Sequence, residues 1–441
     1  MKLDDWLDQR SRTCPDRIAL VADGAEVTYA ELEAEASWVA RRLEAHGVRR
    51  GSVAALTMHP HREQVVLLHA LMKVGAVLLP LGPRLTDTER TAVLAAEEPD
   101  VALDDPGQLT QTEADLPLLG EHDMDAPCCR ILTSGSSGKP KAVELTYGNF
   151  LWGAVGSAFN IGVEPEDRWL CCLPLSHIGG LSIFMRSVIY GTTAVLHDGF
   201  DVDRVAAALE RDEITVVSLV TTMLTRLLEA GADLSAPRTI LVGGGPVAAE
   251  PLEEAIGRGA TVVQTYGLTE ACSQVTTLAP ADARRKLGSA GRPLLTTHLR
   301  IQDGEILVQG PTVAPGCVDA DGWLHTGDLG RIDEDGFLYV EDRIDDMIVT
   351  GGENVVPAEV EQVLLRHPAV ADAAVVGRDD PEWQQAVTAV VVLTDGSEVT
   401  PDELRRHCAE QLAGFKVPKR VELAAALPRT PSGKLLRRAL R

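Results

Sequence analysis

The sequence has few aromatic residues and a shortage of positive charge. Aromatic residues make up 4% of its 441 residues, 41 basic residues face 65 acidic ones, and the formal net charge is −24. A surface of this sign repels nucleic-acid backbones and anionic lipids, so we expect neither as a partner. A ligand that carries phosphate would therefore need basic groups gathered locally against the acidic background.

Disulfide spacing and long apolar runs are also missing. The eight cysteines include no C-x-x-C pair, and the adjacent pairs at 128–129 and 171–172 cannot easily bridge internally, so we expect reduced, mostly buried thiols. The N-terminus lacks the apolar segment of a signal peptide. The most apolar stretch, residues 65–81, is interrupted by His69 and Lys73 and fits a buried helix followed by a strand. These absences indicate a cytoplasmic protein without membrane insertion.

Strands and helices alternate through the first three quarters of the chain. Thr28-x-x-Glu31 predicts a capping box that opens a helix with one apolar face. We expect strands at 18–21, 27, 53–58, 76–79, 216–219 and 239–242, and further helices at 63–73, 203–211 and 223–230. Repeated β-α-β units are typical of parallel sheets flanked by helices, so the predicted fold class is α/β.

The chain is longer than one hydrophobic core usually serves, and its composition changes near Arg343. Beyond this point we expect helices at 358–367 and 401–412 and strands at 370–376 and 386–393, enough for a small α+β domain. The polar junction at 342–346 can act as a hinge. We therefore expect a large domain of mixed and parallel sheets at residues 1–343 and a small mobile α+β domain at residues 344–441.

The strongest local signal is ILTSGSSGKPK at residues 131–141. The end of an apolar strand leads into a loop of glycines and hydroxyls that two lysines close. Backbone N–H groups and hydroxyls of such a loop can bind phosphate, while Lys139 or Lys141 supplies positive charge. A flexible linker would seldom lie between a buried strand and another apolar run. The pattern G-x-x-x-x-G-K-[ST] is absent, which disfavours kinase-like transfer.

TSGSSGKPK resembles the phosphate loop of the acyl-adenylating superfamily, which includes acyl-CoA ligases, luciferases and carrier-loading adenylation domains. Further motifs of that family follow in its order: YGLTE at 266–270, GWLHTGD at 322–328, RIDDMIVTGGEN at 343–354 and PSGK at 431–434. One such motif would be weak evidence, but five in order span nearly the whole chain. The resemblance implies an enzyme that uses ATP and Mg²⁺ to activate a carboxylic acid and then forms a thioester with CoA.

The resemblance also implies roles for single residues. Those expected to bind ATP are Thr133, Ser134, Gly135, Ser136, Ser137, Gly138, Lys139, Lys141, Gly243, Gly244, Gly245, Tyr266, Gly267, Thr269, Asp328 and Arg343. Tyr266 would lie against adenine, and Asp328 would bind both ribose hydroxyls with Arg343 beside it. Glu270 would be the metal ligand and catalytic, because a carboxylate suits Mg²⁺. A conventional helix start, with Thr269 as N-cap and Glu270 in the first turn, is compatible with these roles.

Further roles are implied for the C-terminal domain. Lys434 would be catalytic in adenylation, because a point charge can offset the negative charge that builds on the α-phosphate and the carboxylate. Asp345 would be the hinge, and a turn about it would withdraw Lys434 and bring Gly351 and Gly352 to the CoA tunnel. The sequence departs from the family's pattern at Asp342, where a glycine is usual.

Residues 173–191 combine a strand-loop that bears His177 with an apolar helix that Arg186 interrupts. Together with TYGN at 146–149, this segment is similar to a branch of the family whose acid carries an aryl and a succinyl carboxylate. One carboxylate reacts, and a guanidinium suits the other. From the residues alone, Arg186 could equally well extend to solvent. His177 could contact the reacting carboxylate, gate the acyl pocket or be a satisfied loop histidine.

We therefore expect an acid–thiol ligase whose partners are a small carboxylic acid, ATP and CoA, and a homo-oligomer is compatible with the sequence. Two alternatives stay open. One is a ligase for another aryl or acyl acid, or an enzyme that loads a carrier protein. The other is a non-catalytic nucleotide-binding protein, against which the retained Glu270, Asp328 and Lys434 argue.

Overall fold

The computed structural model describes residues 1–103, 107, 109, 112–115, 117–134, 140–245, 249–350, 353–381, 383–429 and 435–441. Contacts divide the chain into two compact units, which are Met1–Leu299 with Val308–Leu324, and Arg300–Leu307 with His325–Arg441. The predicted domain boundary between residues 343 and 344 was placed where we expect the small domain to turn. That boundary stays a prediction.

A sheet of nine strands runs through the first unit in the order β16-β15-β14-β13-β12-β10-β11-β2-β3. In this order, the strands from β14 to β2 are parallel. Strand β3 runs antiparallel to β2, β15 to β14, and β16 to β15. Their bounds are β2 Ile18–Ala22, β3 Ala25–Thr28, β10 Arg168–Cys171, β11 Thr193–Leu196, β12 Val216–Val220, β13 Thr239–Gly243, β14 Val262–Leu268, β15 Ser273–Thr277 and β16 Arg292–Pro293. This arrangement confirms the predicted α/β class.

A second sheet of the same unit has the order β6-β4-β5-β8-β9. Its first four strands are parallel, and β8 and β9 form an antiparallel hairpin. The bounds are β4 Val53–Thr57, β5 Val77–Leu81, β6 Val101–Leu103, β8 Pro127–Ser134 and β9 Pro140–Thr146, and a separate pair joins β1 Lys2–Asp4 to β7 Glu121–Asp123. Within the described residues, no helix combines the length and apolarity needed to span a membrane.

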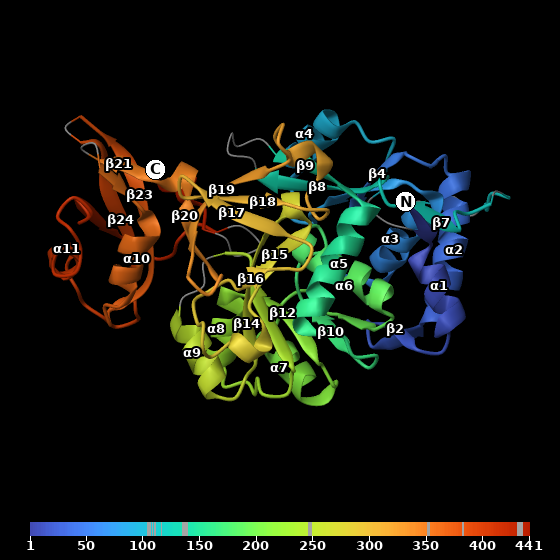
Figure 1. Cartoon of the computed structure of the whole chain (residues 1–441), viewed down its shortest axis with the longest axis horizontal. Helices are drawn as coiled ribbons and strands as arrows, with labels where there is room; N and C mark the ends of the chain where they lie inside the picture. The colour runs from blue at the N-terminus through green and yellow to red at the C-terminus, as the bar shows by residue number, and fades with distance from the viewer. Residues whose placement is uncertain are drawn as a thin grey trace. The chain divides into compact units, whose positions relative to one another are not determined.

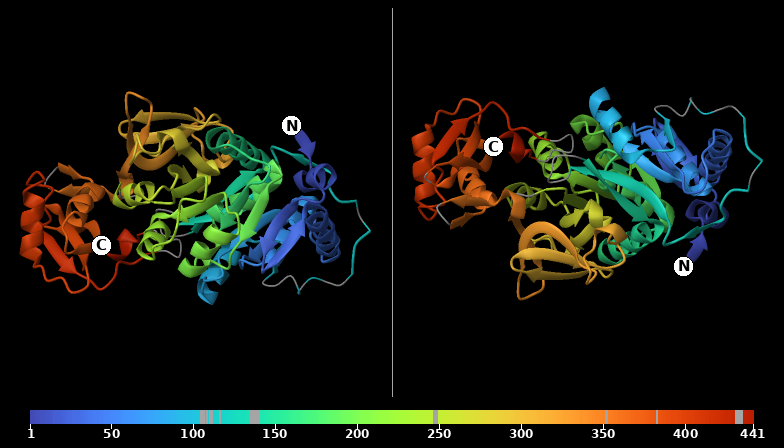
Figure 2. Two further views of the ribbon diagram at one scale, coloured as in Figure 1. Left: turned by 90° about the horizontal axis from the view of Figure 1, so that it is seen from below. Right: turned by 90° about the horizontal axis from the view of Figure 1, so that it is seen from above.

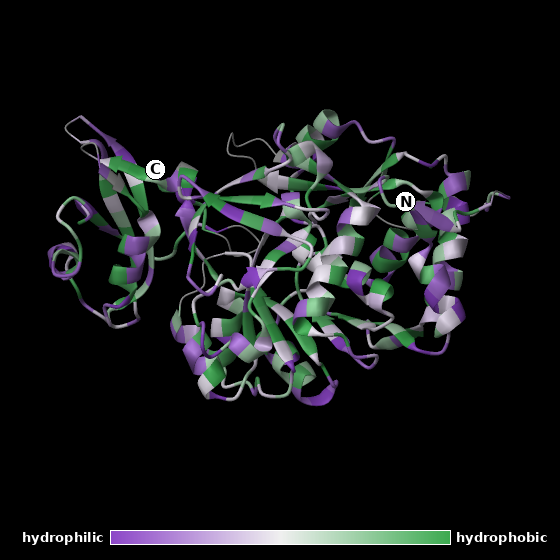
Figure 3. Cartoon of the chain, in the orientation of Figure 1, coloured by the Kyte–Doolittle hydropathy of each residue, from purple (hydrophilic) through white to green (hydrophobic). Residues whose placement is uncertain are grey.

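Helices flank the nine-stranded sheet, whose strands β10 to β16 are coloured from green to yellow in Figures 1 and 2. Their bounds are α1 Trp6–Thr13, α2 Tyr29–Ala45, α3 Arg62–Val74, α4 Asp87–Glu97, α5 Tyr147–Ile161, α6 Ile178–Tyr190, α7 Val202–Arg211, α8 Thr221–Glu229 and α9 Ala249–Gly257, with short 3-10 turns η2 Thr269–Ala271, η3 Pro280–Asp282 and η4 Pro315–Cys317. The predicted Thr28–Glu31 capping box is confirmed at the start of α2. Apolar residues dominate the strands of the nine-stranded sheet, and α7 at its surface carries both apolar and polar residues (Figure 3).

The second unit holds most of two further sheets. The first has the order β17-β18-β19-β20, and the second has β22-β21-β24-β23 with β25 beside β24. The bounds are β17 His298–Gln302, β18 Glu305–Gln309, β19 Leu324–Ile332, β20 Leu338–Arg343, η5 Ile344–Asp346, β21 Ile348–Thr350, β22 Glu353–Val355, α10 Pro357–Leu365, β23 Val370–Asp380, β24 Gln384–Leu393, α11 Pro401–Ala409, β25 Arg420–Leu423 and η6 Arg437–Ala439. Helices α10 and α11 share an apolar core with β23 and β24, which confirms the predicted α+β domain.

The apolar stretch at 65–81 is the buried helix α3 followed by β5, as predicted. Its two polar interruptions are buried as well. Lys73 Nζ lies 2.9 Å from Glu33 and 3.6 Å from Asp5, whose other oxygen lies 2.8 Å from His122 Nε2. His69 is buried one turn before Lys73. A buried charge needs such partners, because leaving water without them is costly.

All eight cysteines are free thiols, and six of them are buried. This confirms the expectation of reduced, mostly buried thiols.

Candidate active site

Parallel strands bring several predicted segments to one edge of the nine-stranded sheet. The carboxyl ends of β10, β13 and β14 point the same way because these strands run parallel through β12. The loop before His177 follows β10, Gly243–Gly245 begin at the end of β13, and Tyr266–Glu270 lie at the end of β14. In open α/β sheets, ligands bind outside the carboxyl ends of the strands.

The phosphate loop begins and ends in the β8–β9 hairpin. Thr133 pairs with Lys141 and Ser134 with Pro140, and the Thr133 hydroxyl donates to the Lys141 carbonyl at 3.1 Å. The hairpin therefore fixes both ends of the loop. Five of its predicted residues, 135–139, and the side chain of Ser134 lie outside the described residues.

Two glycines at the sheet edge allow backbones to approach closely. A Cβ on Gly267 would lie 1.7 Å from the Ser273 carbonyl oxygen, where β14 and β15 shift register. A Cβ on Gly243 would lie 2.6 Å from Thr265 Cγ2 on the neighbouring strand. Gly244 has a left-handed φ of +85°, and Gly245 has open space around its Cα. A side chain at Gly243 or Gly267 would therefore displace the strand end that carries Tyr266.

The turn after β14 presents Thr269 and Glu270. Leu268 is the N-cap of η2, so Thr269 is the first residue of the turn and the conventional N-cap interpretation of Thr269 was wrong. The Glu270 carbonyl accepts a hydrogen bond from the Ala314 amide at 2.8 Å, which holds this turn against η4. Tyr266 is buried and Glu270 is half-buried.

The pKa of Cys317 responds both to a residue of the η2 turn and to a residue of the β8–β9 hairpin. Burial raises the pKa of this half-buried thiol, the Glu270 carboxylate raises it further, and Lys141 opposes the shift. Both charged groups therefore lie close enough to Cys317 to act on it. The structure thus brings a predicted phosphate-binding lysine and the predicted metal ligand to the same side of the first unit. The sequence interpretation missed Cys317, because a single cysteine in η4 carries no pattern.

His177 and Arg186 lie on the same helix, α6. His177 is the N-cap, its side chain makes no capping bond, and it is accessible to solvent. Nearby protein atoms lower the pKa of His177 through desolvation. The imidazole is therefore neutral near pH 7 and has one N–H that it can donate.

Arg186 is 3% exposed, so it does not extend to solvent. Its guanidinium carbon lies 5.7 Å from the centre of the Trp169 ring, and no carboxylate of the described residues forms an ion pair with it. Burial lowers the pKa of Arg186, while Tyr190 and Cys272 oppose the shift. Cys272 directly follows η2, so Arg186 lies near the turn that carries Glu270. The structure therefore brings the predicted acid-binding arginine close to the predicted nucleotide motif.

The predicted ribose pair is formed within the second unit. Asp328 on β19 lies opposite Arg343 on β20, and Arg343 Nε donates to Asp328 Oδ1 at 2.7 Å. The Asp328 amide donates to the Thr326 hydroxyl at 3.1 Å, which fixes the backbone at this position. Asp328 is buried, while the Arg343 side chain is 43% exposed.

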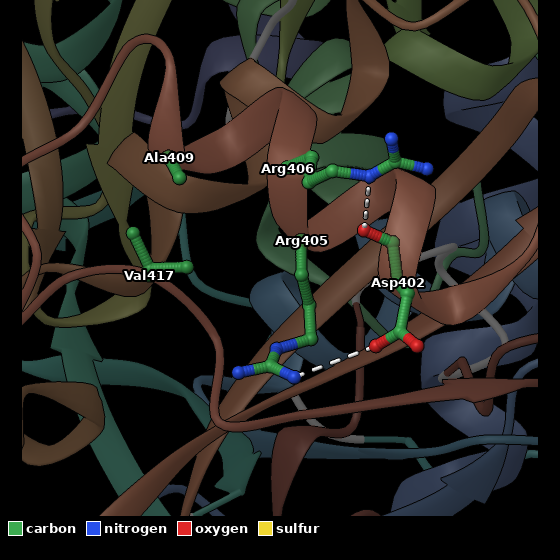
Figure 4. A pocket seen from close by; sticks show the side chains of 5 residues that line it. All are labelled: Asp402, Arg405, Arg406, Ala409 and Val417. Atoms are coloured by element: carbon green, nitrogen blue, oxygen red, sulfur yellow. Dashed lines mark hydrogen bonds and ion pairs between the residues drawn. The ribbon is translucent and has the colours of Figure 1, made fainter.

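The remaining predicted residues are only partly described. Asp345 lies in η5, and its side chain lies outside the described residues, as do Gly351, Gly352 and Lys434. A separate pocket of about 350 Å³ lies on α11 and is lined by Asp402, Arg405, Arg406, Ala409 and Val417 (Figure 4). Asp402 accepts from Arg405 at 3.5 Å and from Arg406 at 3.4 Å there. None of the predicted site residues lines it.

Two family models match the chain. The model described as AMP-binding enzyme covers residues 7–317, and the model described as AMP-binding enzyme C-terminal domain covers residues 359–434. The chain therefore belongs to the AMP-binding enzyme family.

Relatives within this family are similar over their full length. The chain is 41% identical to the 2-succinylbenzoate–CoA ligase of Bacillus subtilis, covering 99% of this chain and 97% of the relative. It is also 41% identical to the enzyme of the same name from Bacillus cereus, with 99% and 98% covered. A solved structure of o-succinylbenzoate CoA synthetase from Bacillus subtilis with the acyl-adenylate intermediate has a TM-score of 0.94 at 40% identity, covering 100% of this chain and 98% of that one. The same enzyme with ATP and a magnesium ion has a TM-score of 0.93 at 40% identity, with both chains covered fully.

Proposed function

We propose that this enzyme activates o-succinylbenzoate with ATP and transfers the acyl group to coenzyme A. Arg186 is the observation that carries the choice of acid. It is buried, forms no ion pair with a carboxylate within the described part of the chain, and acts electrostatically on the Cys272 thiol. A buried cation is stabilised by an anion that forms charge-assisted hydrogen bonds with it. A dianionic acid supplies such a group while its other carboxylate reacts, and the similar enzymes from two Bacillus species are named for that acid.

The described residues fit Mg²⁺ and ATP. Glu270 offers a carboxylate on a turn held by the Ala314 amide, and an oxygen ligand suits Mg²⁺, which also shares oxygens with the nucleotide. When bound, the ion neutralises charge on the phosphates. The hairpin residues Thr133–Lys141 hold the phosphates, Tyr266 and Gly243–Gly245 hold adenine, and Thr269 contacts phosphate. Asp328, already fixed by Arg343, accepts hydrogen bonds from both ribose hydroxyls.

In the first step, an oxygen of the acid's carboxylate bonds to the α-phosphorus of ATP, and the bond from phosphorus to pyrophosphate breaks. The product is an acyl-adenylate. Lys434 offsets the negative charge that builds on the α-phosphate and the carboxylate. His177 donates its N–H to the reacting carboxylate, which its neutral state and accessible position favour. Arg186 holds the second carboxylate and so orients the acid.

In the second step, the domain of residues 344–441 turns about Asp345. Lys434 leaves the site, and Gly351 and Gly352 come to line the path of the pantetheine arm, where larger side chains would narrow it. The thiol of CoA gives up its proton to solvent, its sulfur bonds to the acyl carbon, and the bond from that carbon to the AMP oxygen breaks. The products are the thioester and AMP. The enzyme acts on these small molecules in the cytoplasm, as a monomer or a homo-oligomer.

Exchange of labelled pyrophosphate into ATP, measured over a set of acids, tests this proposal. The set contains o-succinylbenzoate, 4-oxo-4-phenylbutanoate, which lacks the aryl carboxylate, 2-butyrylbenzoate, which lacks the succinyl carboxylate, and simple benzoates. We expect exchange with o-succinylbenzoate to exceed that with each monoacid, and we expect AMP and thioester to accumulate in equal amounts when CoA is added. Faster exchange with a monoacid, or acyl transfer to a carrier protein in preference to CoA, would replace this proposal with one of the two other ligase functions.

A further inference from the structure

An arginine near the C-terminus joins three carboxylates of the second unit. Arg437, in η6, lies 2.7 Å from Glu361, 3.3 Å from Asp346 and 3.8 Å from Asp342. The side chains of Arg437 and Glu361 are each 11% exposed, and that of Asp342 is 3% exposed. Burial raises the pKa of Asp342 and of Glu361, and Arg437 opposes both shifts. Arg437 therefore favours the ionised form of both buried carboxylates.

The carboxylates lie on opposite sides of the proposed pivot. Asp342 belongs to β20 and precedes η5, the turn that contains Asp345, whereas Asp346 and Glu361 follow the pivot. The other Asp342 oxygen accepts from the Ala358 amide at 2.9 Å, near the start of α10. Two contacts of a single aspartate thus bridge the turn.

A rotation about Asp345 would affect the Arg437–Glu361 contact and the Arg437–Asp342 contact differently. Glu361 Oε1 accepts from the Val375 amide at 2.7 Å, so Arg437 and Glu361 belong to the same rigid sheet and helix. A rotation about Asp345 moves this group as one body and leaves its internal distances unchanged. The same rotation changes the distance between Arg437 and Asp342. Only the contacts of Asp342 are therefore sensitive to the hinge.

We propose that Asp342 and Arg437 form a latch across the hinge, which is closed during adenylation and must open for thioester formation. The latch rests on the proposed two-step function. Its direction follows from the neighbours of the two residues. Arg437 is three residues after Lys434, and Asp342 directly precedes Arg343, which donates to Asp328. The closed latch therefore fixes the C-terminal segment next to the proposed ribose-binding strand. Asp342 and Arg437 are positioning residues that act through Lys434 and contact no substrate.

The test compares the two half-reactions in Asp342→Asn, a variant that removes the charge facing Arg437 and keeps one side-chain oxygen for either the Ala358 or the Arg343 amide, both of which donate to Asp342. Adenylation is followed by pyrophosphate exchange with o-succinylbenzoate, and thioester formation by single turnover of supplied o-succinylbenzoyl-AMP with CoA. We expect the ratio of the adenylation rate to the thioester rate to fall about fivefold or more. An exposed ion pair contributes up to about this factor, and the partners here are buried. The KM for ATP should change less than the adenylation rate.

A matched control comes from the same helix as Glu361. Glu359 pairs with Lys416 at 2.6 Å, and within the described part of the chain neither side chain forms an ion pair with Asp342 or Arg437. Glu359→Gln removes one ion pair from the second unit, and we expect the ratio of the two rates to be unchanged. Arg437→Lys keeps a positive charge and should give a smaller shift than Arg437→Gln. If Arg437→Gln fails to fold because it leaves Glu361 buried without a counter-charge, Asp342→Asn still decides the question.

Each outcome has one meaning. A lower ratio in Asp342→Asn, absent in Glu359→Gln and not increased when Arg437→Lys is added, supports the latch. Equal losses in both half-reactions, or an unchanged ratio, refute the latch while leaving the proposed function intact. If the wild-type enzyme exchanges pyrophosphate with no acid of the set, the proposed function fails, and the latch fails with it.

Discussion

Replacing Arg186 by glutamine tests the choice of acid most directly. Arg186 is 3% exposed, lies beside the Trp169 ring and forms no ion pair with a carboxylate among the described residues, so a bound carboxylate would supply its counter-charge. Loss of a charged hydrogen-bonded partner costs about 1.5–3 kcal/mol, which corresponds to roughly a 10- to 150-fold effect. We expect kcat/KM for o-succinylbenzoate to fall by this factor in Arg186→Gln.

The monoacids provide the internal control for this variant. The analogue that lacks the carboxylate held by Arg186 never gains that interaction, so its kcat/KM should change less than about twofold if the reasoning holds. The KM for ATP should also stay unchanged, because the nucleotide residues lie on other elements. Arg186→Lys should recover only part of the loss, since an ammonium cannot reproduce the planar fork of a guanidinium. Equal losses toward monoacids and o-succinylbenzoate would refute the assignment.

Stability gives a second, independent measurement on the same residue. A buried guanidinium without a carboxylate partner destabilises the ligand-free protein, because its desolvation is not compensated. Arg186→Met should therefore unfold at a Tm equal to or above that of the wild type in the absence of substrate. Added o-succinylbenzoate and ATP should raise the Tm of the wild type more than that of the variant. A lower Tm for Arg186→Met without ligand would show that Arg186 is a structural residue.

Three further predictions follow from other parts of the chain. Lys434→Ala should slow formation of the acyl-adenylate by orders of magnitude and leave the reaction of supplied acyl-adenylate with CoA nearly intact, as single-turnover assays would measure; equal losses in both would contradict its role. Asp345→Pro fixes φ at the proposed pivot, so adenylation should survive while thioester formation collapses, and wild-type rates for both would exclude Asp345 as the hinge. His69 is buried, and desolvation lowers its pKa to about 4, so the unfolded state binds more protons than the folded state between pH 6.5 and 4. Stability should therefore fall by about 3 kcal/mol as the pH falls through this range, and the fall should be absent from urea unfolding of His69→Leu.

Local patterns were sufficient to predict many elements of the fold. The Thr28–Glu31 capping box, the strand at 216–219 and the helix at 203–211 agree with the structure to within a residue or so, because capping and periodicity act over a few neighbouring residues. The predicted helix at 401–412 ends at Ala409 instead. Helix ends depend on how the last turn packs, and sequence patterns record this weakly.

Long-range contacts were the part that the sequence could not supply. Arg186 could be read as solvent-exposed or buried, and only packing of α6 against its neighbours decides for burial. In the sequence, Asp342 was notable only because the family usually has a glycine there. No pattern in the sequence predicts its ion pair with Arg437, which lies 95 residues away. Electrostatic clusters of this kind form when distant segments meet, so periodicity and motif spacing carry no trace of them.

The buried cluster of Asp5, Lys73 and His122 has a practical consequence for anyone who shortens or tags this protein. Asp5 lies directly after β1, which pairs with β7 at Glu121–Asp123 and is also held by an ion pair of Lys2 with Glu121. Removing the first five residues, or pulling them away with a fused partner, would leave the Lys73 ammonium with Glu33 alone and His122 without its carboxylate. Removing one partner from a buried charged cluster costs up to about 3–5 kcal/mol, a large part of the stability of an ordinary domain. Affinity tags are therefore better attached through a long flexible spacer that leaves the β1 pairing undisturbed.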